Sequence, residues 1–283
     1  MTIKHVGIVG AGTMGNGIAQ ACAVAGIDAL ILDVSAPALE KGIANISGSL
    51  DRLLKKEKIT VDQKAAAIAR VKTTQTLADL AACDYVIEAA TENEDLKIKI
   101  LRDLDATLKP ETIIATNTSS ISITQLAAAT KRPDRFIGMH FFNPVPMMAL
   151  VELIRGLATS DATLATAKAF AVALGKTPIT VKNSPGFVVN RILCPMINEA
   201  IFCLQEGLAT AEDIDAGMKL GTNQPIGPLA LADMIGLDIM IAVMNVFYEG
   251  FNDPKYRPAP LLKEMVAAGY LGRKTSRGFY TYA

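Results

Sequence analysis

Two side chains suited to proton transfer lie in an otherwise apolar stretch, RFIGMHFFNPVPMMALVELI, which spans residues 135–154. These are His140 and Glu152. Burying either group is costly unless it finds a partner. The unperturbed pKa of histidine, about 6.5, lets it take and return a proton near neutrality, and a carboxylate on its second nitrogen would set its tautomer. The pattern favours an acid–base dyad, while a structural histidine stays an alternative on spacing alone.

The predicted strands separate the chain's two histidines. His140 ends the strand pattern RFIGMH, and ligands of open α/β sheets bind beyond the carboxyl ends of the strands. His5 begins the first strand, so we expect it at the opposite edge of the sheet and on the surface. Glu152 alternates with Val151 and Leu153 in ALVELI. If the two strands pair antiparallel through NPVPMMA, Glu152 can lie opposite His140.

A glycine motif indicates nucleotide binding. GIVGAGTMGNGIAQ contains Gly10-x-Gly12-x-x-Gly15 between a strand pattern and a helix pattern. The first glycine permits a tight turn, the second lets a pyrophosphate approach the backbone, and the third allows close packing of helix on strand. The helix would turn its free N–H groups toward the phosphates. The strand before the motif and the helix after it make a dinucleotide site the favoured interpretation.

An acidic residue at the end of the second strand predicts the choice of cofactor. Asp33 would accept hydrogen bonds from the ribose hydroxyls of NAD and would repel a 2′-phosphate. Val34 and Ser35 follow it and supply no arginine to bind that phosphate. We therefore predict NAD in preference to NADP. Asp33 as an ordinary helix N-cap is the alternative.

Further polar side chains follow predicted strands or open predicted helices. ATNTSSIS places Asn117, Thr118, Ser119 and Ser120 after a buried strand. A single helix cap needs only one such group, so a ligand-facing role for the others is reasonable.

Single polar residues elsewhere carry weaker signals. Asn190 stands in the first turns of a predicted helix beside the domain boundary, where ligands often bind. Glu92 and Lys97 follow the fourth strand and could border a cofactor, although each alone reads as a surface charge. The basic helical end at residues 47–58 is either an ordinary solvated face or a binding site for the tail of a phosphate-bearing substrate.

The elements that position these residues alternate between strand and helix in the first two thirds of the chain. This order predicts an α/β domain, residues 1–184, with a mainly parallel, doubly wound sheet. Pro185-Gly186 marks the boundary. Residues 185–283 predict an all-helical C-terminal domain, with helices over 187–206, 211–219, 227–251 and 259–268 and a terminal strand in GFYTY.

Composition excludes several classes of function. The 283 residues carry 28 basic and 28 acidic side chains, so no global charge attracts nucleic acid or an anionic membrane. We expect no metal site, no targeting segment and no membrane span. The four cysteines show no CxxC pairing, which is typical of a reduced, cytoplasmic protein.

Five motifs in their order resemble the L-3-hydroxyacyl-CoA dehydrogenase family over nearly the whole chain. They are GAGTMGNGIAQ, EAATENEDLK, TNTSS, GMHFFNPVPMMALVE and NSPGFVVNR, and the ending LGRKTSRGFYTY fits too. The chain is similar to the stand-alone bacterial 3-hydroxybutyryl-CoA dehydrogenase type, since no hydratase domain is fused. Arg277 departs from the family pattern, in which an acidic residue is common at this position.

The resemblance implies a Rossmann-type domain, a helical dimerisation domain and a homodimer. It implies hydride transfer between NAD and an acyl-CoA substrate, acetoacetyl-CoA or 3-hydroxybutyryl-CoA, with His140 as the base and Glu152 as its partner. Ser119 and Asn190 would position the substrate. The implied NAD contacts are Gly10, Gly12, Thr13, Met14, Gly15, Asp33, Glu92, Lys97, Asn117, Ser119, Asn143 and Lys274. The implied coenzyme A contacts are Ser49 and Lys56, with Ser119 touching both ligands.

Other functions stay open on the sequence. Related 3-hydroxyacid dehydrogenases that act without coenzyme A use a lysine base, which NSPGFVVNRI lacks. The short-chain dehydrogenase motif YxxxK matches Tyr270 and Lys274, but only in the last residues. An NAD-binding protein that serves structure or sensing without turnover is the third alternative. Acyl length, direction and pathway, whether fatty-acid oxidation, polyester metabolism or butanol-type fermentation, are also open.

Overall fold

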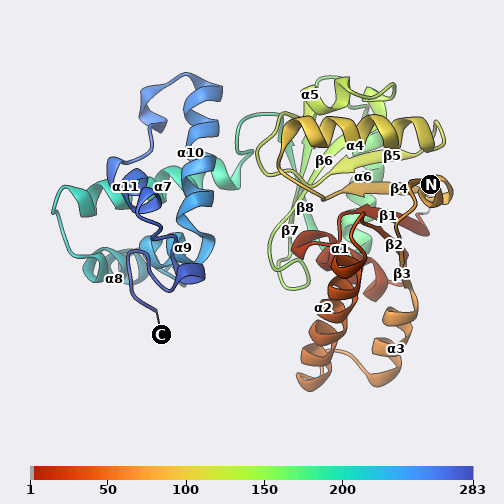
Figure 1. Cartoon of the computed structure of the whole chain (residues 1–283), viewed down its shortest axis with the longest axis horizontal. Helices are drawn as coiled ribbons and strands as arrows, with labels where there is room; N and C mark the ends of the chain where they lie inside the picture. The colour runs from red at the N-terminus through yellow and green to blue at the C-terminus, as the bar shows by residue number, and fades with distance from the viewer. Residues whose placement is uncertain (1–2, 283) are drawn as a thin grey trace. The chain divides into compact units, whose positions relative to one another are not determined.

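An eight-stranded sheet forms the centre of the first unit of the chain (Figure 1). The computed structural model describes residues 3–282, and its contacts divide the chain into Met1–Ser184 and Pro185–Ala283, at the position where the sequence places the boundary. The strands are β1 (His5–Val9), β2 (Asp28–Leu32), β3 (Val71–Thr74), β4 (Tyr85–Glu88), β5 (Ile113–Thr116), β6 (Phe136–Phe141), β7 (Leu150–Arg155) and β8 (Thr177–Lys182).

The strand order is β3-β2-β1-β4-β5-β6-β7-β8. All neighbouring strands pair in parallel except β6 and β7, which pair antiparallel. The mainly parallel, doubly wound sheet predicted from the sequence is confirmed. Because β1, β4, β5 and β6 run in one direction, their carboxyl ends meet at one edge, where ligands of such sheets bind.

Helices cover both faces of the sheet. They are α1 (Thr13–Val24), α2 (Ala36–Lys55), α3 (Val61–Ala69), α4 (Glu94–Thr107), α5 (Ile123–Ala128) and α6 (Asp161–Ala173), with the short 3-10 helices η1 (Leu77–Ala82) and η2 (Pro133–Arg135). A single apolar cluster joins α1, α2 and α6 to the strands, and α4 and α5 lie on the other side (Figure 1). The central strands β4, β5 and β6 are buried on both faces, which explains their nearly continuous apolar runs.

The second unit consists of helices around a core of its own. They are α7 (Val189–Gln205), α8 (Ala211–Thr222), α9 (Pro228–Ile235), α10 (Leu237–Phe251) and α11 (Pro260–Ala267), with the short 3-10 helices η3 (Pro254–Tyr256) and η4 (Arg273–Thr275). The core contains Leu229, Met240, Met244 and Phe247, all nearly inaccessible to solvent. The predicted all-helical C-terminal domain is confirmed.

Two local predictions in this unit are wrong. The helix predicted over 227–251 breaks at Gly236, whose φ of +105° is open to glycine but unfavourable for other residues, and α9 and α10 meet at 99°. GFYTY forms no strand, and only Thr281 within it makes an isolated bridge, with Arg277. The backbone N–H groups of Phe279 and Tyr280 instead donate to the buried carboxylate of Asp233, each at 3.0 Å.

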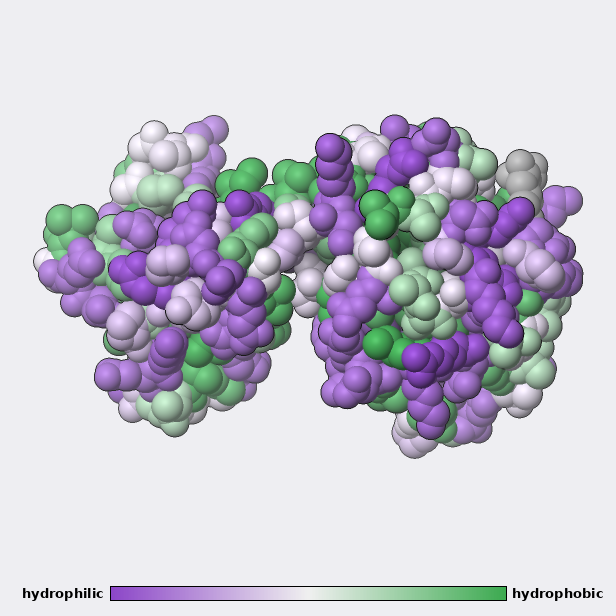
Figure 2. Space-filling view, turned by 90° about the horizontal axis from the view of Figure 1, so that it is seen from above, coloured by the Kyte–Doolittle hydropathy of each residue, from purple (hydrophilic) through white to green (hydrophobic). Residues whose placement is uncertain are grey.

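Within residues 3–282, none of the helices is by itself long and apolar enough to cross a membrane. Only the bent pair α9 and α10, taken together, has the necessary length and composition. On the face drawn in Figure 2, hydrophilic residues make up most of the visible surface, and hydrophobic residues lie in small groups between them.

Candidate active site

His140 and Glu152 form a buried pair across the antiparallel strands. The register of β6 and β7 places the two residues directly opposite each other, and His140 Nδ1 lies 2.8 Å from Glu152 Oε2. Glu152 is fully buried and His140 is 7 % exposed. A carboxylate only accepts hydrogen bonds, so Nδ1–H donates to it, and this tautomer places the lone pair of the imidazole on Nε2. The arrangement suits a base whose orientation is set by its partner.

A hydrogen bond from Phe141 to Asn117 links the end of β6 to the segment that follows β5. Asn117 follows β5, and its side-chain Oδ1 accepts a hydrogen bond from the backbone N–H of Phe141 at 2.9 Å. The backbone N–H of Asn117 in turn donates to Glu88 O of β4 at 2.8 Å. Asn117, predicted as an NAD contact, thus also holds the strand segment that presents His140.

The glycine loop joins β1 to α1 in a shape that only glycine permits. Gly10 has a φ of +104°, and a Cβ there would meet Ala89 O at 2.7 Å. A Cβ on Gly15 would lie 1.8 Å from Gly10 O. At Gly12 the same added atom would find nothing within 4 Å, and no side chain among the described residues caps α1 there. The open backbone and the uncapped helix start, which includes Thr13 and Met14, fit the phosphates of NAD.

Asp33 is bonded to the glycine loop and does not cap a helix. Its Oδ2 accepts from Ala11 N at 2.8 Å and its Oδ1 from Ser35 N at 3.0 Å. The N-cap of α2 is Ser35, whose hydroxyl accepts from Ala38 N. The alternative in which Asp33 serves as an ordinary N-cap is therefore wrong. Each carboxylate oxygen keeps a second lone pair that a ribose hydroxyl can use.

A buried ion pair lies at the carboxyl end of β4. Lys97 and Glu88 are 1 % and 0 % exposed, and Lys97 Nζ lies 2.5 Å from Glu88 Oε2. Thr116 donates its hydroxyl to the same oxygen at 2.7 Å. Lys97, predicted as an NAD contact, thus forms its ion pair with Glu88. Glu88 was not predicted from the sequence, because its position in an apolar strand gives no sign of its partner nine residues on.

Glu92 orients the first serine of the TNTSS motif. Its Oε1 accepts from the backbone N–H of Ser119 at 2.6 Å and from the hydroxyl of Ser119 at 2.9 Å, and its Oε2 accepts from Thr118 Oγ1 at 2.8 Å. Lys97 Nζ lies 3.8 Å from the same Oε2. The cap of α5 is Ser122, so Ser119 and Ser120 are not needed as caps. Glu92 and Ser119, both predicted at the site, therefore lie in contact.

The other predicted residues of the first unit lie at its surface. Asn143 is exposed in the loop between β6 and β7. Ser49 is half-buried on α2, and Lys56 is exposed at the C-cap of the same helix, two turns later. This spacing puts Ser49 and Lys56 on one side of α2, as a shared contact with one ligand requires.

Two predicted residues belong to the second unit. Asn190 is half-buried in the first turn of α7. Lys274 Nζ pairs with Asp238 Oδ1 at 2.5 Å and Oδ2 at 2.6 Å. This contact lowers the pKa of Asp238 against the opposing effect of its partial burial.

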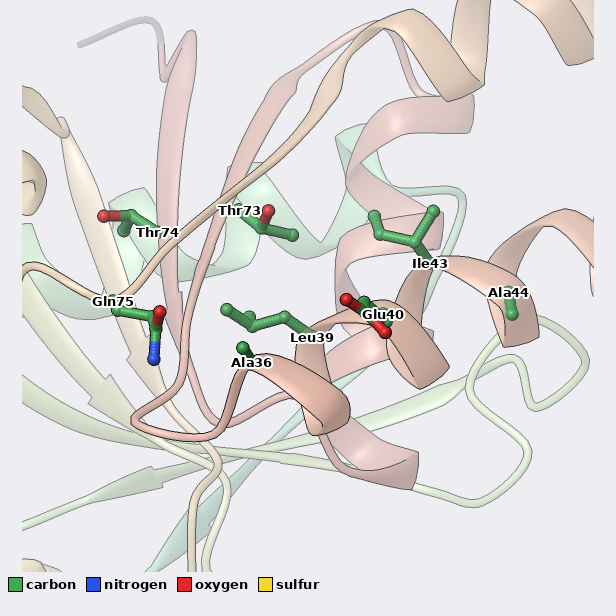
Figure 3. Close-up of a pocket in the computed structure, with 8 residues that line it drawn as sticks. All are labelled: Ala36, Leu39, Glu40, Ile43, Ala44, Thr73, Thr74 and Gln75. Carbon is green, nitrogen blue, oxygen red and sulfur yellow. The ribbon is translucent and has the colours of Figure 1, made fainter.

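A pocket of about 620 Å³ lies apart from the dyad. It is lined by Ala36, Leu39, Glu40, Ile43 and Ala44 of α2 and by Thr73, Thr74 and Gln75 at the end of β3 (Figure 3). None of the residues predicted for catalysis lines it. In residues 3–282 no group of three or more His, Cys, Asp or Glu side chains could hold a metal ion.

Comparison with known proteins gives one consistent family. A family model described as 3-hydroxyacyl-CoA dehydrogenase, NAD binding domain, matches residues 5–184, and one described as its C-terminal domain matches residues 186–282. The chain is 57 % identical to a 3-hydroxybutyryl-CoA dehydrogenase of Bradyrhizobium diazoefficiens over 99 % of this chain and 96 % of that protein. It is 49 % identical to the 3-hydroxybutyryl-CoA dehydrogenase of Clostridioides difficile over 97 % and 98 %.

The solved structures agree with this family. The crystal structure of an (S)-3-hydroxybutyryl-CoA dehydrogenase from Ralstonia eutropha superimposes with a TM-score of 0.98 at 68 % identity, and the match covers 100 % of both chains. The predicted family and the predicted NAD cofactor are confirmed.

The position of Asp33 predicts how the protein chooses between dinucleotides. In Asp33→Ser, the dissociation constant for NADH should rise about tenfold or more, because a hydrogen bond to a charged group is lost. Affinity for NADPH should hold or improve, since the repulsion of the 2′-phosphate is removed. Fluorescence titration of both nucleotides checks this, with Asp62→Ser, an exposed acid on α3, as the control. Equal affinity of the unaltered protein for NADH and NADPH would contradict the assignment.

Proposed function

Because this chain belongs to the 3-hydroxyacyl-CoA dehydrogenase family, we propose that it interconverts (S)-3-hydroxybutyryl-CoA and acetoacetyl-CoA by hydride transfer. The protein is an NAD-dependent oxidoreductase. The observation that carries the finer proposal is the contact of His140 with Glu152 at the sheet edge that also carries the glycine loop. A proton acceptor and a dinucleotide site at one edge are the two parts that oxidation of an alcohol requires.

His140 takes the proton of the C3 hydroxyl in this proposal. Nδ1–H donates to Glu152, so Nε2 carries the lone pair that accepts the proton. Glu152 then faces an imidazolium and stabilises its charge. NAD, when bound, supplies the acceptor for the hydride that leaves C3. In the reverse direction the imidazolium returns its proton to the carbonyl oxygen of acetoacetyl-CoA.

Alignment of the substrate falls to one side chain from each unit in this proposal. We assign Ser119 and Asn190 to the reacting oxygen or the thioester carbonyl, because orientation supplies much of the rate of such reactions. The contact of Glu92 with the Ser119 hydroxyl supports this role, since it fixes the direction of that group. Ser49 and Lys56, on one side of α2, are assigned to coenzyme A.

We further propose a homodimer formed through the helical unit. Ile192, Leu208, Leu220 and Met234 of this unit are between 52 % and 86 % exposed in the single chain, so packing of a second copy against them would remove apolar surface from water. A second copy would cover part of this surface. The cytoplasmic location stays a prediction that rests on the cysteine pattern.

The substrate is tested by oxidation of NADH with acetoacetyl-CoA, followed at 340 nm. We expect rapid turnover with the thioester and little with free acetoacetate, because only the thioester carries the coenzyme A arm that Ser49 and Lys56 would hold. Equal efficiency with free acetoacetate would favour a 3-hydroxyacid dehydrogenase that acts without coenzyme A. Binding of NADH without any turnover would favour the structural or sensing role.

The role of His140 is tested against the other histidine of the chain. His140→Ala should lower kcat by roughly 10²–10⁴-fold, as is typical for a lost acid–base group, while NADH still binds. His5→Ala is the matched control, since His5 is exposed at the start of β1 and should leave kcat unchanged. Near-normal turnover of a folded His140→Ala protein would remove the proposed base.

The proposed role of Glu152 is to orient the imidazole of His140, so its replacement should affect kcat more than the affinity for NADH. Glu152→Gln keeps the size of the side chain but removes the charge that stabilises the imidazolium. We expect kcat to fall by about tenfold or more, with the dissociation constant for NADH changed little. Steady-state kinetics and NADH titration of the same preparation separate the two quantities. A variant that lost only NADH affinity would contradict this role.

A further inference from the structure

Lys176 is a buried lysine that no predicted role uses. It precedes β8 and is 9 % exposed. Its Nζ donates to Val145 O at 2.5 Å and to Met148 O at 2.9 Å. In the described part of the chain no carboxylate forms an ion pair with Lys176, and burial lowers its pKa. Burying a lysine that bonds only to two carbonyl oxygens costs free energy, so this arrangement needs an explanation.

Both carbonyls belong to the loop between the two strands of the dyad. This loop joins His140 on β6 to Glu152 on β7 and contains Pro144 and Pro146. Proline has no N–H, so the loop has fewer backbone donors with which to close on itself. Within it, the N–H groups of Met147 and Met148 share one acceptor, Pro144 O. Lys176 supplies donors from outside the loop, and an ammonium group carries three of them.

The same loop is also held against the helix that follows the glycine motif. Val145 is 2 % exposed. A Cβ added to Gly17 of α1 would lie 2.9 Å from Val145 Cβ, so the loop fills a notch that only glycine leaves. The side chain of Val145 therefore contacts α1 while its carbonyl is bound to Lys176. The segment that carries Asn143 is fixed between the dinucleotide helix and the start of β8.

We propose that Lys176 is a positioning residue for NAD, which acts by holding this loop so that Asn143 meets the bound dinucleotide. The inference goes beyond the proposed function in assigning a role to a residue outside the site, and it rests on the contact with NAD that the family resemblance implies for Asn143. Lys176 itself touches neither NAD nor the acyl-CoA. Its effect reaches the cofactor through two backbone carbonyls of the loop.

The test compares three lysine variants by NADH titration and steady-state kinetics. Lys176→Met keeps an unbranched side chain, one atom shorter, without its donors and should raise the dissociation constant and KM for NADH about tenfold, with a smaller change in kcat. Lys176→Arg keeps donors and should recover most of the affinity. Lys168→Met, an exposed lysine on α6, is the matched control and should behave as the unaltered protein.

A purely structural role predicts a different result. It would lower the midpoint of thermal unfolding but leave NADH affinity unchanged well below that midpoint, and this outcome would overturn the proposal. If Lys176→Met does not fold, Lys176→Gln, which retains two N–H donors on a shorter side chain, is measured in the same way. Failure of the unaltered protein to reduce acetoacetyl-CoA would refute the proposed function. The effect of Lys176 on NADH affinity could still be measured, because NADH titration needs no acyl-CoA.

Discussion

A fully buried carboxylate can lie beside an imidazole ring only if a hydrogen bond joins the two groups. Glu152 lies between apolar residues of its strand, Val151 on one side and Leu153 on the other, and its charge would be very costly there without His140. The antiparallel register of β6 and β7 provides the contact, because a slip of one residue would turn Glu152 to the opposite face of the sheet. The dyad and the register therefore stabilise one another.

The sheet places this pair at the edge that also carries the glycine loop. The parallel strands β2, β4, β5 and β6 end at one edge, and a polar side chain at the end of each reaches a neighbour. Asn117 binds the backbone beside His140, Glu88 binds Lys97, and Asp33 binds the glycine loop. The charges of Asp33, Glu88 and Lys97 each have a partner within the same unit. The edge can therefore be polar while both faces of the sheet stay apolar.

The sequence was sufficient for features that depend on local pattern, and insufficient for those that depend on distant contacts. The glycine motif and Asp33 have fixed spacings, so they could be recognised before the fold was known. The break at Gly236 depends on a single backbone angle inside an apolar run, and a helical pattern continues through it. The GFYTY segment has strand-like composition, but Asp233, more than forty residues away, takes its backbone donors. Lys176 could not be predicted because its partners are carbonyl oxygens, which every residue has.

In the proposed mechanism, charge balance explains why a base at the position of His140 needs a buried carboxylate. Before proton transfer the pair carries the single negative charge of Glu152, which its hydrogen bond to His140 partly compensates. After transfer the pair becomes an imidazolium beside a carboxylate, so the proton creates an ion pair and no isolated positive charge. A neutral residue opposite His140 would leave the imidazolium alone in the same apolar surroundings. In the proposed reaction the register of two strands thus sets the energetic cost of the proton transfer, and the loop that joins the strands has to keep that register.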